Sequence, residues 1–284
     1  MAMSSPTVRR RELGALLRAL RTEAGLTVEQ VADNLLCSPS KISRLETGQR
    51  GASPRDIRDL CDLYRVTDPG QRDHLAELAT EGRAQAWWQP FDLPYATYVG
   101  LEAEAASIRN FAPGVFHGLL QIPGYTRAVH ERGMPQLAPA VIEQRIEVLR
   151  GRQEALTRED PPAPRLWAIV DEAVLHRPVG GPAVMAEELD HVIEACDLPN
   201  VTVQVIANDA GAHPALNSTF TLLDFAGPAP GVVHVEGLVG QLYFERSHDV
   251  QRYQEVFEWL SAIALDEQRS VELMAKMSAD FSHR

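Results

Sequence analysis

The chain lacks the long apolar runs, the cysteine patterns and the low-complexity tracts that mark several classes of protein. No apolar run approaches the roughly 18 residues that a membrane-spanning helix needs. The N-terminus is basic, but charge interrupts its apolar positions, so no secretory signal is expected. The three cysteines are far apart and show no CxxC spacing, which argues against a disulfide framework or a zinc site. We therefore expect a cytoplasmic protein with no membrane partner, no metal and no cofactor.

Catalytic signatures are also absent from the sequence. It contains no HExxH, GxSxG, Walker-type or GxGxxG pattern, the spacings that hold a metal, a serine nucleophile or a phosphate. A cluster of four charged or titratable residues follows the apolar run RLWAIV. They are Asp171, Glu172, His176 and Arg177. We expect Glu172 and Arg177 to form a structural ion pair, and we expect no enzyme. The alternative use of these four residues is a site for a small-molecule effector or a protein partner.

Charge is unevenly distributed along the chain, whose net charge is −12. Residues 1–58 hold ten Lys and Arg against six Asp and Glu, a balance of +4. Residues 59–284 hold the other seventeen against thirty-three, a balance of −16. Only the N-terminal head therefore favours a polyanion such as DNA.

Residues 8 to about 83 show the spacing of five short helices, which predicts a compact all-α domain. Leu13, Leu16, Leu17 and Leu20 fall on one helical stripe. Thr27 begins TVEQ, a capping box in which the threonine hydroxyl caps the helix and the glutamine reaches back. Three further helix starts pair a capping residue with proline, and they are Ser38-Pro39, Ser53-Pro54 and Asp68-Pro69.

The third of these helices, Ser38 to Glu46, has the pattern of a helix that enters the major groove of DNA. Ile42 and Leu45 share the face that packs on the first two helices, which leaves a short, polar and positive face outward. Arg44 is suited to a bidentate contact with guanine. The residues that we select as candidate DNA contacts are Thr27, Ser38, Pro39, Ser40, Lys41, Ser43, Arg44 and Arg50.

A solvated helix face is the alternative interpretation of these residues. It explains Ser40 and Lys41 as well as DNA binding does, because any amphipathic helix turns polar side chains outward. It does not explain the ordered combination of a capping box, a Ser-Pro start, the IS-x-x-E-x-G pattern and local positive charge. We therefore favour DNA binding.

The stretch LxxLRTEAGLTVEQVA…SPSKISRLETGQR resembles the Xre group of lambda-repressor-like helix-turn-helix domains, over about residues 9–66. The resemblance implies a double-stranded DNA operator as partner and a structural ion pair between Arg21 and Glu46. The family often has a phosphate-bonded glutamine where this chain has Val28, so the resemblance does not supply that contact. The residues that carry it are Gly25, Leu26, Thr27, Val31, Ala32, Ile42, Ser43, Glu46, Gly48 and Arg50.

The rest of the chain predicts a larger α+β domain with a small mixed sheet, and we set the domains at residues 1–83 and 84–284. After the break at DPPAP, short β-branched and apolar runs predict strands in RLWAIVD, VTVQVIA, STFTLLDFA, GVVHVEG and QLYFE. Helices are expected in LEAEAASIRNF, VIEQRIEVLRGRQEAL and AVMAEELDHVIEAC, and again from Asp249 to Phe281.

Most of residues 95–275 resembles the long uncharacterised domain that follows Xre heads in actinobacterial, WhiJ-like regulators. The segments that carry this resemblance are YVGLEAEA, GLLQIPGYTRA, RQEAL, DEAVLHRPVGG, VTVQVIA with NDAGAH after it, and STFTLLDF. Such proteins are described as antitoxin-like, which implies a small protein partner encoded by a neighbouring gene. We expect a homodimeric, sequence-specific regulator whose acidic body mediates dimerisation, partner binding or signal sensing. The alternatives are an antitoxin-like binding module and a ligand-gated repressor.

Overall fold

The structure, a computed structural model, describes residues 6–226, 230–238 and 240–283. Its internal contacts divide the chain into two compact units, Met1–Glu104 and Ala105–Arg284. This division groups residues 84–104 with the N-terminal helices, whereas the second domain expected from the sequence begins at residue 84. The expected boundary stays a prediction, because contacts do not measure where independent folding stops.

The first unit is all-helical, and the five helices expected within residues 8–83 are confirmed. Thr27, Ser38, Ser53 and Asp68 each cap a helix, because each side chain accepts the backbone N–H three residues on. At Thr27 and Ser53 the reciprocal bond completes a capping box. The helices are α1 (Pro6–Glu23), α2 (Val28–Asn34), α3 (Pro39–Glu46), α4 (Pro54–Leu63), α5 (Pro69–Glu81) and α6 (Ala96–Glu104).

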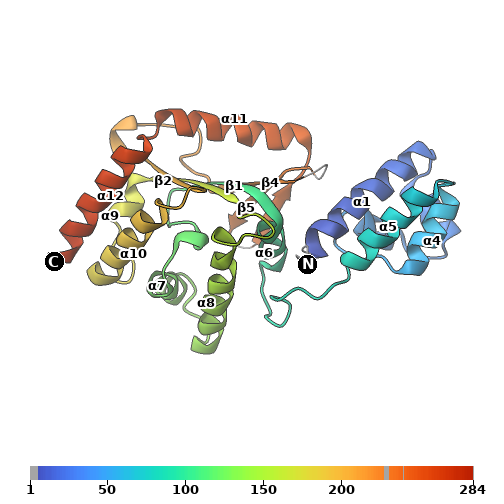
Figure 1. The fold of residues 1–284 in the computed structure, drawn as a ribbon, viewed down its shortest axis with the longest axis horizontal. Helices are drawn as coiled ribbons and strands as arrows, with labels where there is room; N and C mark the ends of the chain where they lie inside the picture. The colour runs from blue at the N-terminus through green and yellow to red at the C-terminus, as the bar shows by residue number, and fades with distance from the viewer. Residues whose placement is uncertain (1–5, 227–229, 239, 284) are drawn as a thin grey trace. The chain divides into compact units, whose positions relative to one another are not determined.

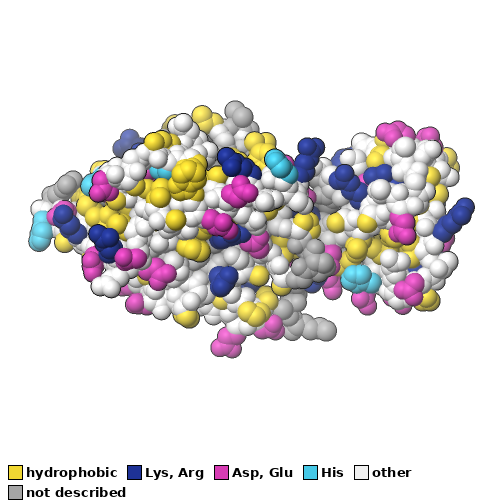
Figure 2. All heavy atoms as spheres, turned by 90° about the horizontal axis from the view of Figure 1, so that it is seen from above, with side chains coloured by type: hydrophobic (Ala, Val, Ile, Leu, Met, Phe, Trp, Pro, Cys, Tyr) yellow, Lys and Arg dark blue, Asp and Glu magenta, His cyan; other side chains and the backbone are white. Residues whose placement is uncertain are grey.

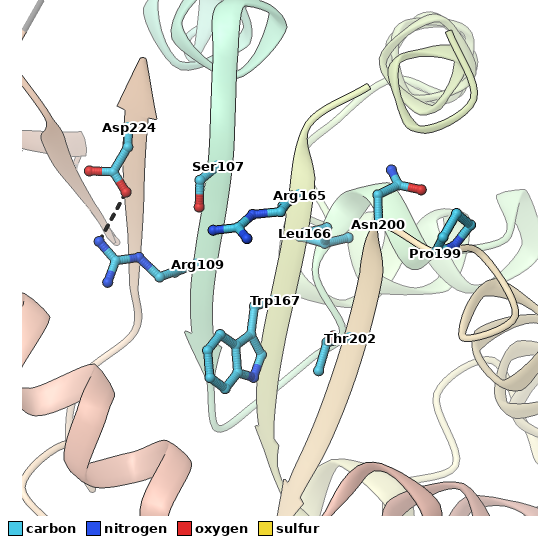
Figure 3. A pocket seen from close by; sticks show the side chains of 9 residues that line it. All are labelled: Ser107, Arg109, Arg165, Leu166, Trp167, Pro199, Asn200, Thr202 and Asp224. Carbon is cyan, nitrogen blue, oxygen red and sulfur yellow. Dashed lines mark hydrogen bonds and ion pairs between the residues drawn. The ribbon is translucent and has the colours of Figure 1, made fainter. Parts of the chain in front are cut away.

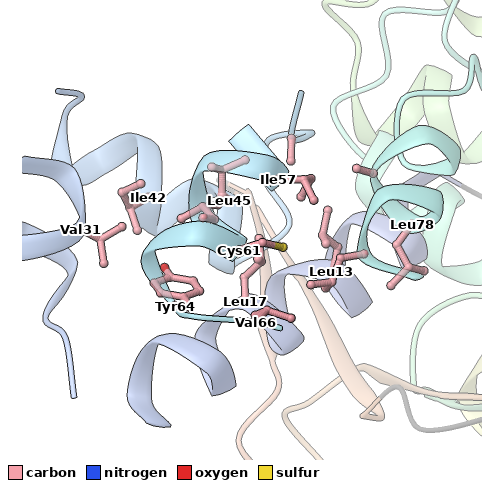
Figure 4. Close-up of a cluster of buried hydrophobic side chains, with 14 of the residues drawn as sticks. Leu13, Leu17, Val31, Ile42, Leu45, Ile57, Cys61, Tyr64, Val66 and Leu78 are labelled. Carbon is pink, nitrogen blue, oxygen red and sulfur yellow. The ribbon is translucent and has the colours of Figure 1, made fainter. Parts of the chain in front are cut away.

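One cluster of buried apolar side chains holds α1 to α5 together (Figure 4). Leu13 and Leu17 come from α1, and Ile42 and Leu45 from the inner face of α3, where the sequence places them. Leu16 and Leu20 pack at the edge of the same cluster. Other members are Val31, Ala32, Ile57, Leu60, Cys61, Tyr64, Leu75 and Leu78.

Glycine allows the C-terminal end of α3 to approach α1 closely. A Cβ atom on Gly14 of α1 would lie 2.6 Å from the carbonyl oxygens of both Leu45 and Glu46. A Cβ atom on Gly48 would lie 2.8 Å from the Cα atom of Arg11, and Gly48 also has a φ angle of +69°, which favours glycine. The position of α3 on α1 therefore depends on two residues without side chains.

The second unit is built on one sheet of six strands, in the order β3-β2-β1-β4-β5-β6 (Figure 1). Strands β1, β2 and β3 run parallel, and the other neighbours pair antiparallel, so the sheet is mixed as expected. The strands are β1 (Ala105–Ala112), β2 (Arg165–Asp171), β3 (Val201–Ile206), β4 (Phe220–Phe225), β5 (Val232–Gly237) and β6 (Gly240–Phe244).

The expectation of a small sheet is wrong, because a sixth strand joins the five expected ones. Strand β1 lies in LEAEAASIRNF, where the sequence indicated a helix, and α6 ends just before it at Glu104. Alanines favour helix, and a polar Asn110 hid the apolar pattern of a buried strand. The burial of Asn110 is tolerated because its amide nitrogen donates hydrogen bonds to the carbonyl of Phe220 and the hydroxyl of Thr221 on β4.

Helices cover both faces of this sheet. In Figure 1, α11 crosses one face, and α7, α8 and α10 lie on the other. Helix α12 packs beside α10 and against β3. Within the described residues, no helix combines the length and apolarity that a membrane crossing requires. The helices of this unit are α7 (Pro123–Gly133), α8 (Pro139–Gln153), α9 (Glu172–His176), α10 (Pro182–Ala195), α11 (Ser247–Ile263) and α12 (Glu267–Ser282).

The second unit also buries a carboxyl group. Glu188 of α10 is fully buried, and its Oε2 atom accepts the backbone N–H of Ile122 at 2.7 Å. Its Oε1 atom has no hydrogen-bond partner among the described residues. Burial disfavours the charged form and raises the pKa of Glu188 from 4.5 to about 8.

Stability should therefore depend on pH through Glu188. Between pH 4.5 and about 8 this group ionises in the unfolded chain but stays protonated in the folded one, so the free energy of unfolding falls as pH rises. We expect Glu188→Gln to remove a decline of a few kcal/mol, measured by urea unfolding from pH 5 to 8. The variant Glu194→Gln, at an exposed residue of the same helix, should keep the decline. Parallel pH profiles for wild type and Glu188→Gln would contradict this role.

The contact between α3 and α1 gives a second prediction. Gly14→Ala places a methyl group against two backbone oxygens, so we expect about 2 kcal/mol or more of lost stability in urea unfolding. Gly70→Ala is the matched control, because its Cβ atom would meet nothing closer than 3.5 Å in the same unit. Equal stability of the two variants would show that α3 does not depend on this close approach.

Candidate nucleic-acid interface

Helices α2 and α3 form a helix-turn-helix supported by α1. The turn between them is short, and the N–H of Cys37 donates to the carbonyl of Ala32 at its start. Leu36 has a φ angle of 49°, in the left-handed region that residues other than glycine rarely use. Val31 of α2 and Ile42 of α3 both lie in the core, so the two helices are held at a fixed angle to each other.

The expected pair between Arg21 and Glu46 is confirmed, and it ties the end of α3 to α1. Arg21 donates from Nε to Oε1 at 2.6 Å and from Nη2 to Oε2 at 3.0 Å, a bidentate arrangement. A third bond runs from Nη1 to the carbonyl of Leu26 at 2.8 Å. The hydrogen bonds that Arg21 donates to Glu46 raise the pKa of Arg21, whose side chain is only 14% exposed. The pair therefore fixes the end of α3 against α1.

The outward face of α3 is polar and exposed, as the sequence indicates. Pro39, Ser40, Ser43 and Arg44 are all exposed. Arg44 donates from Nε to the carbonyl of Ser40 at 3.1 Å, which directs the guanidinium along the helix. Its other two nitrogens have no partner in the part of the chain that the structure describes. This face therefore presents a fixed guanidinium and two small hydroxyls.

The remaining candidate contacts are at helix ends. Thr27 and Ser38 are exposed, and their hydroxyls cap α2 and α3. Arg50 is exposed beyond α3, and its N–H donates to the carbonyl of Arg44 at 3.1 Å. All three are therefore accessible to solvent: Thr27 at the start of α2, Ser38 at the start of α3 and Arg50 beyond its end.

Lys41 is a candidate DNA contact that already forms an ion pair within the protein. Its Nζ atom lies 2.5 Å from Oδ1 of Asp56 in the first turn of α4. Burial raises the pKa of Asp56, but hydrogen bonds from Lys41 and Ser53 outweigh it and hold that pKa below its ordinary value. The ion pair joins the start of α4 to α3, so Lys41 is less available to DNA than Arg44.

Two residues near this face were not selected from the sequence. Leu36 in the turn has a side chain that is 95% exposed, which is unusual for leucine. Arg55, the second residue of α4, is 82% exposed and only 3.4 Å from Asp59. A basic residue directly after the Ser53-Pro54 start is a signal that could have indicated Arg55.

The second set of candidate residues lies at the end of β2 and in α9. Asp171 caps α9 by accepting the N–H two residues on, and Arg177 donates to the carbonyl of Gly114 at 3.0 Å. The expected ion pair between Glu172 and Arg177 is wrong: Glu172 contacts His176 at 2.9 Å, one helical turn away. The four residues are close together but bonded within the protein. Within the described chain, no group of His, Cys, Asp and Glu has the arrangement of a metal site.

Comparisons with known proteins agree with this geometry. Residues 12–75 match a helix-turn-helix domain, and residues 95–276 match a domain of unknown function, DUF5753. A relative is the HTH-type transcriptional repressor RghR of Bacillus subtilis (strain 168), which is 34% identical over 102 residues. That match covers 35% of this chain and 70% of RghR. No solved structure matches the chain. The chain therefore belongs to the helix-turn-helix proteins and, through the larger part of its length, to the DUF5753 family.

Proposed function

We propose that this protein is a sequence-specific transcriptional regulator that reads DNA with the outward face of α3. The observation that carries the proposal is the exposed guanidinium of Arg44, set beside Ser40 and Ser43 on a helix whose other face is locked into the core. Eight residues make a helix of about 12 Å, which fits the major groove. Two nitrogens of Arg44 are then available to the O6 and N7 acceptors of guanine.

Contacts to the phosphates would surround this helix. The first turns of α2 and α3, at Thr27 and Ser38, present backbone N–H groups of the kind that bind phosphate oxygens. Arg50 beyond α3 and Arg55 in the first turn of α4 are exposed and basic, and we assign them further phosphate contacts. Lys41 is assigned a smaller part, because its charge is compensated by Asp56.

The acidic body is assigned a role away from the duplex. The second unit, residues 105–284, holds 14 Lys and Arg against 24 Asp and Glu, a balance of −10, and acidic side chains are spread over its face in Figure 2. Like charge repels such a surface from the phosphates. The body is therefore suited to forming a dimer, to binding a protein partner or to sensing a signal. We assign it no catalytic step.

Two copies would read one operator. A single α3 reaches few base pairs, so a homodimer with half-sites about 10 base pairs apart is the arrangement that such heads require. We place the protein in the cytoplasm, where the chromosome is. The name of RghR, a repressor, supports repression as the direction of regulation.

A second candidate is an antitoxin-like module that holds a small protein encoded by a neighbouring gene. The resemblance of residues 95–275 to WhiJ-like regulators favours it, and it is compatible with DNA binding if the partner tunes operator affinity. Co-purification of the neighbouring gene product with the full chain, and its loss on removal of residues 84–284, is the test.

The substitution Arg44→Ala tests the proposed base contact. We expect it to weaken binding to the cognate operator by about tenfold or more, because a bidentate contact to guanine contributes about 1–3 kcal/mol. Binding to random DNA should fall much less, in a gel-shift titration at fixed salt.

The control for this measurement is Arg72→Ala. It removes the same charge from the same unit, at a residue of α5 that pairs with Asp62. We expect it to lower affinity for operator and random DNA alike, and only slightly. An equal loss on both DNAs with Arg44→Ala would reduce Arg44 to a phosphate contact.

A further inference from the structure

One face of the sheet in the second unit is covered only in part. Phe111, Ile169 and Phe220 pack in the cluster that includes Phe257 and Leu260 of α11. Toward the opposite end of β1, β2 and β3 the same face turns polar and is hollowed by a cavity of ≈ 610 Å³ (Figure 3). This sheet pocket is lined by Ser107, Arg109, Arg165, Leu166, Trp167, Pro199, Asn200, Thr202 and Asp224.

Some hydrogen-bond donors of the sheet pocket have no partner among the described residues, and one of them, Arg165, is exposed to solvent. Arg165 has no hydrogen-bond or ion-pair partner among the described residues, and the same holds for the hydroxyls of Ser107 and Thr202. Arg109 donates from Nη2 to Asp224 at 2.9 Å, but its buried Nε atom has no hydrogen-bond partner in the described part of the chain. Figure 3 shows the Arg165 guanidinium directed toward Ser107. An anion would satisfy Arg165 and Ser107 together, because the two residues are paired on β1 and β2.

The walls of the sheet pocket are held in place by bonds outside it. The indole nitrogen of Trp167 donates to Gln204 at 2.8 Å, and its ring meets Phe257 edge-on with centroids 5.3 Å apart. The amide of Asn200 donates to the carbonyls of Leu156 and Pro164. The Trp167 ring is thus fixed where it borders the cavity, as a binding surface requires.

The charge of the sheet pocket is opposite to that of the surrounding body. Two guanidiniums, on Arg109 and Arg165, face one carboxylate, on Asp224, within a segment whose balance is −16. Arg109 also lies over the Phe257 ring, 5.8 Å from its centroid, which keeps its guanidinium close to the sheet. A positive cavity within an acidic domain indicates selection for a negatively charged ligand.

We propose that the sheet pocket binds a small organic anion with a flat ring and a phosphate or carboxylate group. The acidic group contacts Arg165 and Ser107, which pair across β1 and β2, because guanidinium and hydroxyl donors suit its oxygens. The ring lies against Trp167. The volume is within the roughly 300–1,000 Å³ of small-molecule sites. This site is separate from Asp171–Arg177 and does not rest on DNA binding.

The test uses the full chain without DNA and three simple probes. Phenyl phosphate and benzoate carry a ring and an anion, whereas benzyl alcohol carries the ring alone. In a saturation-transfer NMR titration we expect saturable binding of at least one anion and none of benzyl alcohol over the same concentrations. No binding of either anion, or equal binding of benzyl alcohol, would overturn the proposal and leave the DNA-binding proposal untouched.

Variants locate the site. Arg165→Ala should lower the affinity for the anion by about tenfold or more, the factor expected for one charge-assisted hydrogen bond. Arg252→Ala, which removes an exposed arginine of α11 outside the pocket, should leave affinity unchanged. Ser107→Ala removes the hydroxyl beside Arg165 and should weaken binding by about threefold. Wild-type affinity in Arg165→Ala, with the fold verified by circular dichroism, would exclude this pocket as the site.

Discussion

The bidentate pair between Arg21 and Glu46 is the interaction on which the orientation of α3 depends. It connects α1 to the last residue of α3, and Gly14 allows the two helices to approach at that end. Helix α3 has only eight residues and contributes two fully buried side chains, so packing alone would hold it weakly. Because this end is fixed, Arg44 and Ser43 are presented on one defined face.

Positive and negative charge are concentrated in different segments of the chain. Residues 1–58, which include α3, carry a balance of +4, whereas residues 59–284 carry a balance of −16. Within that body the sheet pocket is a local exception, with Arg109 and Arg165 on neighbouring strands. An organic anion bound there and a polyanion bound at α3 would each meet positive charge at its own site. Such a division suits a regulator that senses the organic anion and reads the DNA.

Local chemistry explains which parts could be predicted from the sequence. Three helix starts can be predicted locally, because the capping side chain accepts a backbone N–H only three residues further on and needs no distant contact. They are the starts at Thr27, Ser38 and Ser53. Strand β1 was missed because its burial depends on Asn110 pairing with β4, more than 100 residues away. The same holds for the sheet pocket, where Arg109 and Asp224 are 115 residues apart. Lys41 was assigned to DNA because the sequence does not reveal that it meets Asp56.

The central claim is that α3 reads the major groove, and methylation interference on the operator tests it most directly. Methylation of guanine at N7 places a methyl group in the major groove, where an arginine would otherwise bond. The account predicts that such methylation blocks binding of the full chain at two clusters of guanines about 10 base pairs apart, on one side of the DNA. Binding that is insensitive to N7 methylation, and blocked only by methylation of adenine N3 in the minor groove, would contradict it.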